Sequence, residues 1–284
     1  MFYTLQLEWV KAVQQIRSPF FDTFFKFFDF FDRQEFVFIL IPAIWLGYHW
    51  KAGLRLFYIL LLSGLVNYAL KHFFACPRPF HLDPSLAVIY VNGYGFPSGA
   101  AQTAVLLPGL LLNYYRNKWT WIVALNFFFG VSLSRVYLGV HFPLDVVTGW
   151  GVGAALWAFF THVRPPLENY LRTLQPQTLF WLSQLIPLSL FYFWQSNVLR
   201  FCTSAMGVGM GVFVCSQLRL FLAPAKNRFQ MVYRTAVGSG GLFALYALLT
   251  LLPIPFPRLH LGLSSYLLGL WLSLGATWLL RSAR

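Results

Sequence analysis

The chain is a succession of apolar stretches separated by short segments in which Pro, Gly, Lys and Arg collect. A membrane-spanning helix needs about 20 predominantly apolar residues, and windows of that length predict nine such helices. The predicted spans are residues 36–50, 53–75, 101–116, 119–138, 144–163, 177–195, 200–221, 230–252 and 262–280. We therefore predict an all-α fold, a polytopic membrane bundle of about nine transmembrane helices.

Residues 4–32 break this pattern, because Phe-rich stretches alternate there with charged residues such as Glu8, Asp22 and Asp29. A helix with an apolar and a charged face is typical of a segment that lies in the membrane interface. We expect an amphipathic helix pair in this position. The chain then divides into an interfacial segment 1–34, a bundle 35–165 that holds the polar motifs described below, and an additional four-helix transmembrane region 176–284.

Composition excludes an ordinary soluble globular protein, because only 10% of the residues are charged and 58% are hydrophobic, whereas about a quarter are charged in soluble domains. The net charge of +13 would suggest nucleic acid for a soluble domain. In a membrane chain it indicates basic cytoplasmic loops, so we expect no nucleic-acid partner. The three cysteines form no metal-binding or disulfide pattern.

The predicted spans place twelve Lys and Arg residues on one side of the membrane and nine on the other. Three of those nine, Lys71, Arg78 and Arg135, lie in polar motifs with a separate explanation. Because basic residues favour the cytoplasmic side, we expect the side with twelve of them to face the cytoplasm. We expect the chain to be an integral protein of a bacterial inner membrane. The side with the motifs then faces the periplasm or the outside.

Three polar motifs border the predicted spans, all on the outward-facing side. They are KHFFACPRP at residues 71–79, FPSGAAQ at 96–102 and SRVYLGVHFPLD at 134–145. The first two border a long polar excursion, residues 76–100, in which several Pro and Gly residues predict a loop. A connection this long inside a compact bundle is usually functional, so we expect the motifs to form one site.

The second and third motifs predict specific local geometry. Ser98 comes directly before an apolar helix and is a candidate N-cap, and free amides beside Gly99 at such a helix start would bind an anion. Pro143 suits the first helical position, which places His141 just outside the helix and Asp145 in its first turn. The carboxylate can then fix the imidazole tautomer and leave the other ring nitrogen free to attack.

Lys71, Arg78 and Arg135 would add three positive charges to the same pocket. Two guanidiniums and an ammonium beside helix-end amides form a binding site for phosphate. Each residue alone has an ordinary alternative, since Lys71 could extend to the membrane surface and His141 could be a hydrogen-bonded interfacial residue. Their convergence on one side of the membrane favours a functional site.

Together the motifs resemble the three-part signature of the type 2 phosphatidic acid phosphatase family. These are integral-membrane lipid phosphatases related to soluble acid phosphatases and vanadium haloperoxidases. The residues that carry the resemblance are Lys71 with Arg78 and Pro79, then Pro97, Ser98 and Gly99, then Ser134 and Arg135 with His141 and Asp145. The resemblance covers about residues 15–163 and leaves the last four predicted spans outside it.

The resemblance implies a phosphatase-like catalytic bundle at residues 35–165 that hydrolyses a lipid phosphate or diphosphate at the extracytoplasmic interface. It implies no metal and no other cofactor. It implies that His141 is the nucleophile, forming a phosphohistidine, and that Asp145 orients it. Phosphate oxygens would be bound by Lys71, Arg78, Ser98, Gly99 and Arg135.

One position departs from the family pattern. The signature normally continues Pro-Ser-Gly with a His that protonates the leaving oxygen, and here that position is Ala100, by natural difference or by engineering. Loss of a general acid costs about 10² to 10⁴ in rate. A diphosphate would suffer less, because its leaving group is a phosphate with a second pKa of about 6. We therefore expect a lipid diphosphate substrate, such as a polyprenyl diphosphate, or phosphoryl transfer between lipids.

Two other functions compete with a lipid phosphatase. One is a lipid-phosphate-binding or structural membrane protein whose catalysis is weakened by Ala100. The other is a transporter, which is disfavoured because the ionisable residues cluster at one interface rather than at the membrane midplane.

Overall fold

The structure, a computed structural model, describes residues 2–190, 196–252 and 255–282. All regular elements of these residues are helical, which confirms the predicted all-α class. In chain order they are α1 (Phe2–Gln14), α2 (Pro19–Asp29), η1 (Phe30–Asp32), α3 (Gln34–Pro42), η2 (Ala43–Tyr48), α4 (Trp50–Phe74), α5 (Pro79–Leu82), η3 (Pro84–Leu86), α6 (Gly99–Tyr114), α7 (Lys118–Tyr137), α8 (Pro143–Ala158), η4 (Phe159–Val163), α9 (Arg164–Leu171), α10 (Pro176–Ser189), α11 (Ser196–Gln217), α12 (Arg228–Leu251), α13 (Pro257–Leu270), η6 (Trp271–Gly275) and α14 (Ala276–Ser282).

Six helical stretches of the described residues are long and apolar enough to cross a membrane. They are Trp50–Leu82, Lys118–Tyr137, Pro143–Leu171, Ser196–Gln217, Arg228–Leu251 and Pro257–Ser282. The predicted count of nine spans is not confirmed. Helix α6 has only 16 residues, and residues 34–48 form the two short helices α3 and η2 around Pro42. The end of the predicted span 177–195 lies outside the described residues.

The chain forms two compact units. One comprises Met1–Phe36 and Val66–Pro166, and the other comprises Val37–Leu65 and Leu167–Arg284. These units do not follow the boundaries predicted from the sequence, because the first half of α4 packs with the C-terminal helices. A side chain at Gly64 would meet the ring of Phe201, and Arg55 forms an ion pair of 2.6 Å with Glu168.

The N-terminal segment forms the expected pair of helices, α1 and α2. Ser18 is the N-cap of α2 and accepts a hydrogen bond from the Phe21 amide. Helix α2 exposes Phe20 and Phe27 and buries Phe25 together with the acidic Asp29. Its two-faced pattern therefore includes a buried carboxylate, and its position in a membrane interface stays a prediction.

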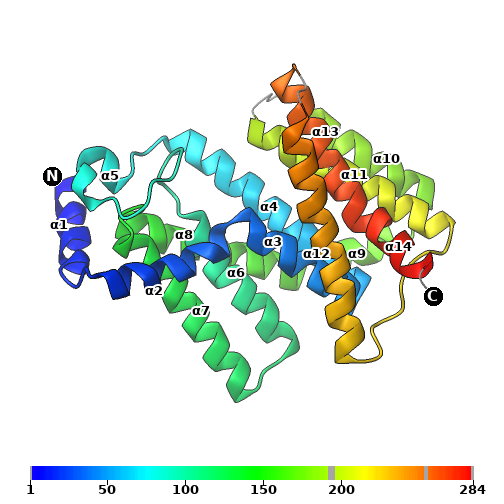
Figure 1. Cartoon of the computed structure of the whole chain (residues 1–284), viewed down its shortest axis with the longest axis horizontal. Coiled ribbons are helices and arrows are strands. Elements are labelled where there is room, and N and C mark those ends of the chain that lie inside the picture. Colours follow the sequence, from blue (N-terminus) through cyan, green and yellow to red (C-terminus); the bar gives the residue numbers. More distant parts are fainter. Residues whose placement is uncertain (1, 191–195, 253–254, 283–284) are drawn as a thin grey trace. The chain divides into compact units, whose positions relative to one another are not determined.

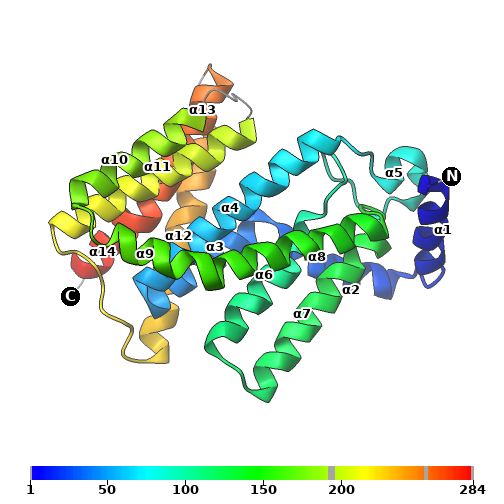
Figure 2. The same cartoon turned by 180° about the vertical axis from the view of Figure 1, so that it is seen from behind.

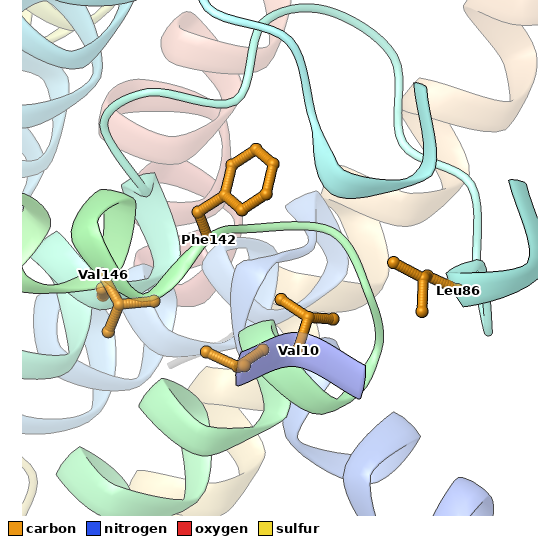
Figure 3. Close-up of a cluster of buried hydrophobic side chains, with 6 residues drawn as sticks. Val10, Leu86, Phe142 and Val146 are labelled. Atoms are coloured by element: carbon orange, nitrogen blue, oxygen red, sulfur yellow. The ribbon is translucent and has the colours of Figure 1, made fainter. Parts of the chain in front are cut away.

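A buried apolar cluster holds the ends of the first unit's helices together. Figure 3 shows Val10 of α1, Leu86 of η3, Phe142 just before α8 and Val146 of α8 in this cluster. Figures 1 and 2 show α1 at the same end of the first unit as α5 and the loop that precedes α6. The cluster therefore fixes the loops that carry the polar motifs against α1.

Helices α6 and α8 approach each other closely through two glycines. A side chain at Gly149 would meet the backbone oxygen of Ser98, and one at Gly153 would meet that of Gln102. Small residues spaced by four positions allow such backbone contact. The Ser98 amide also donates a 2.9 Å hydrogen bond to the Asp145 carbonyl. The contact therefore joins the second motif to the third.

We predict that Gly153→Ala destabilises the protein by about 1–3 kcal/mol, because the added methyl group overpacks the contact with α6. Gly151→Ala is the matched control on the same helix, since a side chain there meets nothing within 4 Å. That change should be neutral or stabilising by up to about 1 kcal/mol, given the higher helix propensity of Ala. Thermal unfolding in detergent measures both, and equal midpoints for the two variants would contradict the close contact.

Candidate active site

A tight turn after α7 presents His141. Gly139 adopts a φ of +71°, in the left-handed region that favours glycine, and a side chain there would meet the Leu86 carbonyl. The amides of Val140 and His141 each donate to the Arg135 carbonyl at 3.2 Å. The imidazole that emerges from this turn is only 4% exposed.

Both ring nitrogens of His141 have partners. Nδ1 lies 3.3 Å from Oδ2 of Asp145, whose carboxylate also accepts from the Phe142 amide at 2.9 Å. Nε2 lies 3.3 Å from Nη1 of Arg78. Because a guanidinium only donates, Nε2 accepts and the ring proton is on Nδ1. Asp145 lies beside Nδ1, and the prediction that it fixes the tautomer and leaves the Nε2 lone pair available stays a prediction.

The surroundings of His141 favour its neutral form. Burial lowers the pKa of His141 well below its ordinary value, and the positive charges of Arg78, Lys71 and Arg135 lower it further. A neutral imidazole is the form that can act as a nucleophile. The surroundings of His141 therefore favour the form that the predicted role requires.

The loop before α6 holds two of the predicted cations beside His141. Arg78, 3% exposed, donates from Nε to the Gly93 carbonyl and from Nη1 to the Val140 carbonyl, both at 2.9 Å. The Lys71 ammonium donates to the Tyr94 carbonyl at 2.6 Å. Hydrogen bonds to backbone carbonyls thus offset part of the cost of burying these charges, and both cations lie on the loop side of His141 that includes Arg78 Nη1.

Arg135 is also buried, but its main partners are carboxylates that the sequence did not assign to the site. Its Nη1 lies 3.0 Å from Asp29 and 3.5 Å from Asp32. Its Nη2 is buried without a hydrogen-bond partner among the described residues. Asp29 was predicted only as a charge of the interfacial segment. The signal available for this pairing was the position of Asp29 next to Phe-rich turns, where a carboxylate can become buried. A buried Arg requires an anionic or carbonyl partner, and such a carboxylate can be that partner.

The start of α6 follows the prediction. Ser98 is fully buried and caps the helix, accepting from the Ala101 amide at 3.3 Å, and Gly99 is the first helical residue. Ala100 is 1% exposed and packs in a cluster with Phe28 and Phe31. Apolar packing therefore surrounds the position where the family signature has a histidine.

A tyrosine from α1 also lies near the site, and no sequence motif indicated it. The Tyr3 ring packs on Phe142 with centroids 5.3 Å apart. A hydrogen bond with the Cys76 side chain, followed by burial, raises the pKa of Tyr3 to about 12, and the charge of Asp145 contributes. Among the described residues, no group of three or more His, Cys, Asp or Glu could hold a metal ion.

Part of the chain is similar to known proteins. Residues 52–168 match the model of the PAP2 superfamily. The chain is 33% identical over 135 residues to an undecaprenyl-diphosphatase of Sulfolobus acidocaldarius, covering 46% of this chain and 64% of the relative. It is 29% identical over 167 residues to a lipid A 4'-phosphatase of Bacteroides thetaiotaomicron, covering 52% of this chain and 72% of the relative.

A solved structure shares the fold. This structure is that of a transmembrane PAP2 type phosphatidylglycerolphosphate phosphatase from Bacillus subtilis. It matches this chain with a TM-score of 0.50 and 24% sequence identity. The similarity covers 58% of this chain and 86% of that one. Residues 169–284 lie outside the range that matches the family model.

We predict that His141 stays neutral when the pH falls through 6.5, the ordinary pKa of a histidine. Burial and three nearby cations disfavour its charged form, so it takes up a proton only below that pH. Nuclear magnetic resonance of the full chain with 15N-labelled histidines should show one imidazole that remains neutral. The same signal should be missing from His141→Gln, and a His141 signal that titrates at 6.5 or above would contradict the prediction.

Proposed function

We propose that the chain is a membrane lipid phosphate or diphosphate phosphohydrolase of the PAP2 superfamily, whose model matches residues 52–168, with His141 as its nucleophile. The observation that carries the proposal is the arrangement of this buried imidazole, with Nδ1 beside Asp145 and the Nε2 lone pair beside Arg78. The names of the relatives, an undecaprenyl-diphosphatase and a lipid A 4'-phosphatase, support a phosphorylated lipid as substrate.

In the proposed reaction, Nε2 of His141 attacks phosphorus and the bond from phosphorus to the leaving oxygen breaks. The Nδ1 proton remains beside Asp145, whose negative charge stabilises the ring as it becomes cationic. Arg78 transfers its hydrogen bond from Nε2 to a phosphate oxygen, and Lys71, Arg135 and the start of α6 at Ser98 and Gly99 bind the others. Water then hydrolyses the phosphohistidine and releases phosphate.

We propose that the site opens at the outer interface of a bacterial inner membrane. The six apolar helical stretches support an integral membrane protein. The spans predicted from the sequence place more basic residues on the side opposite the motifs, and this excess supports an outward-facing site. The exposed Phe20, Phe24 and Phe27 of α2 suit a helix that lies in the interface, from which a lipid headgroup could reach His141.

A lipid diphosphate is the substrate that fits Ala100 best. Its leaving group is a phosphate, which needs less protonation than the alkoxide that leaves a monophosphate. Transfer of the phosphoryl group to a second lipid is an alternative end to the same reaction.

A protein that only binds lipid phosphates is the second candidate function, because Ala100 is packed among Phe side chains at the position of the family's general acid.

The experiment measures phosphate release by the purified full chain from dodecyl diphosphate and dodecyl phosphate in detergent. We expect faster release from the diphosphate. His141→Ala should lower release by roughly 10³-fold or more, as loss of a nucleophile does. Phosphate on an added lipid acceptor would indicate transfer. Binding without release would support the binding protein, and faster release from the monophosphate would contradict a diphosphate preference.

A further inference from the structure

Helix α1 carries two glutamines on the face that packs against the rest of the first unit. Gln6, Val10 and Gln14 are spaced by four residues, and side chains with this spacing lie on the same face of a helix. Val10 is fully buried in the cluster that contains Phe142, and Gln6 is only 5% exposed. Buried amide groups are normally hydrogen-bonded, so the partners of the two glutamines show what this face does.

Gln14 holds the end of α7. Its Nε2 donates to the carbonyl of Tyr137, the last residue of α7, at 2.7 Å and to the Leu86 carbonyl at 2.8 Å. The last carbonyls of a helix have no partner within the helix, so Gln14 supplies one from another helix. The Leu86 carbonyl lies against Gly139 and leaves no space for a side chain there. Gln14 therefore joins α7 to η3 at the point where the chain turns toward His141.

Gln6 holds the start of α8. Its Oε1 accepts from the amide of Leu144, the second residue of α8, at 3.1 Å. The first amides of a helix also lack a partner within it. The next residue is Asp145, whose carboxylate lies beside Nδ1 of His141. Gln6 therefore fixes the end of the helix that carries the partner of the imidazole.

The two contacts lie on either side of His141 along the chain. We call residues 138–142, which join α7 to α8, the His141 turn. Gln14 binds the residue before this turn, and Gln6 binds the second residue after it. The Tyr3 ring of α1 lies 5.3 Å from the ring of Phe142, which is part of the turn. Helix α1 thus contacts both the turn and the helical residues that flank it.

From these contacts we propose that Gln6 and Gln14 are positioning residues of the reaction, which hold the His141 turn so that Nε2 lies in line with the bond that breaks at phosphorus. The inference rests on the proposed phosphohydrolase function and adds α1 to its site, although α1 lies outside the residues 52–168 that match the family model. Both glutamines act through the backbone rather than on the substrate. Displacement of a reacting atom by about 1 Å can cost about 10²-fold in rate, so loss of either contact should lower turnover.

The partners fix the direction of both side-chain amides. The Leu144 amide only donates, so Gln6 presents its oxygen, and carbonyls only accept, so Gln14 presents its nitrogen. An ionised glutamate has the same length as glutamine but only accepts. It can therefore replace Gln6, where the start of α8 also favours a negative charge, and it cannot replace Gln14.

The test measures kcat and KM of the detergent-solubilised full chain for the faster of the two dodecyl substrates. Gln6→Met and Gln14→Met remove the hydrogen bonds at similar side-chain size. Each should lower kcat by about 10- to 10²-fold and leave KM nearly unchanged, because the cations that bind phosphate stay in place. Gln15→Met is the matched control directly after α1, where Gln15 is exposed, and should change neither. Gln6→Glu should keep more of kcat than Gln6→Met, whereas Gln14→Glu should lose at least as much as Gln14→Met.

Inhibition separates a displaced nucleophile from a loss of folded protein, because an inhibition constant does not depend on the folded fraction. Inorganic phosphate competes by binding to the cations. Vanadate, which can take five ligands, resembles phosphorus in the transition state and also needs Nε2 in line. In Gln6→Met and Gln14→Met we expect vanadate to inhibit more weakly, by about the factor lost in kcat/KM, and phosphate to inhibit as before.

Equal changes of both inhibition constants in the Met variants, or no change in either, would overturn the proposal, because the glutamines would then act on the fold alone. Equal tolerance of glutamate at positions 6 and 14 would overturn it too, and this comparison decides the question if a Met variant does not fold. His141→Ala tests the proposed function separately. If that variant releases phosphate at the unaltered rate, the proposed function fails. Normal turnover in both Met variants beside an inactive His141→Ala overturns only the positioning role.

Discussion

The first unit is organised by the need to bury cations beside a neutral imidazole. Arg78 and Arg135 are 3% and 1% exposed, and an unpaired charge at such depth would cost several kcal/mol. The surrounding chain supplies acceptors in two ways. Carbonyls of the loop before α6 accept hydrogen bonds from Arg78, and Asp29 pairs with Nη1 of Arg135. The irregular loop and the buried acid of α2 are therefore requirements of the site.

Features set by nearby residues could be predicted from the sequence. Apolar stretches of helix length give the all-α class, the residue before an apolar run gives the Ser98 cap, and a proline gives the start of α8 at Pro143. The contact between His141 and Asp145 follows from their spacing of four residues. Each depends on a single turn of chain, where local geometry leaves few alternatives.

Features set by distant residues could not be predicted in this way. Arg135 and Asp29 are 106 positions apart, and no pattern near either residue identifies the other. The same holds for α4, whose first half packs with the C-terminal helices through partners such as Glu168. The predicted number of spans is also not confirmed, because apolar composition does not show where a helix such as α6 ends.

The contact between Arg78 and Nε2 of His141 has a consequence for chemical selectivity. The Nε2 lone pair is engaged by a guanidinium 3.3 Å away. A neutral molecule offers Arg78 no better partner, so the lone pair remains engaged. An anion attracts the guanidinium and thereby frees Nε2. Under the proposed role of His141 as nucleophile, the negative charge of the substrate would itself make Nε2 available for attack.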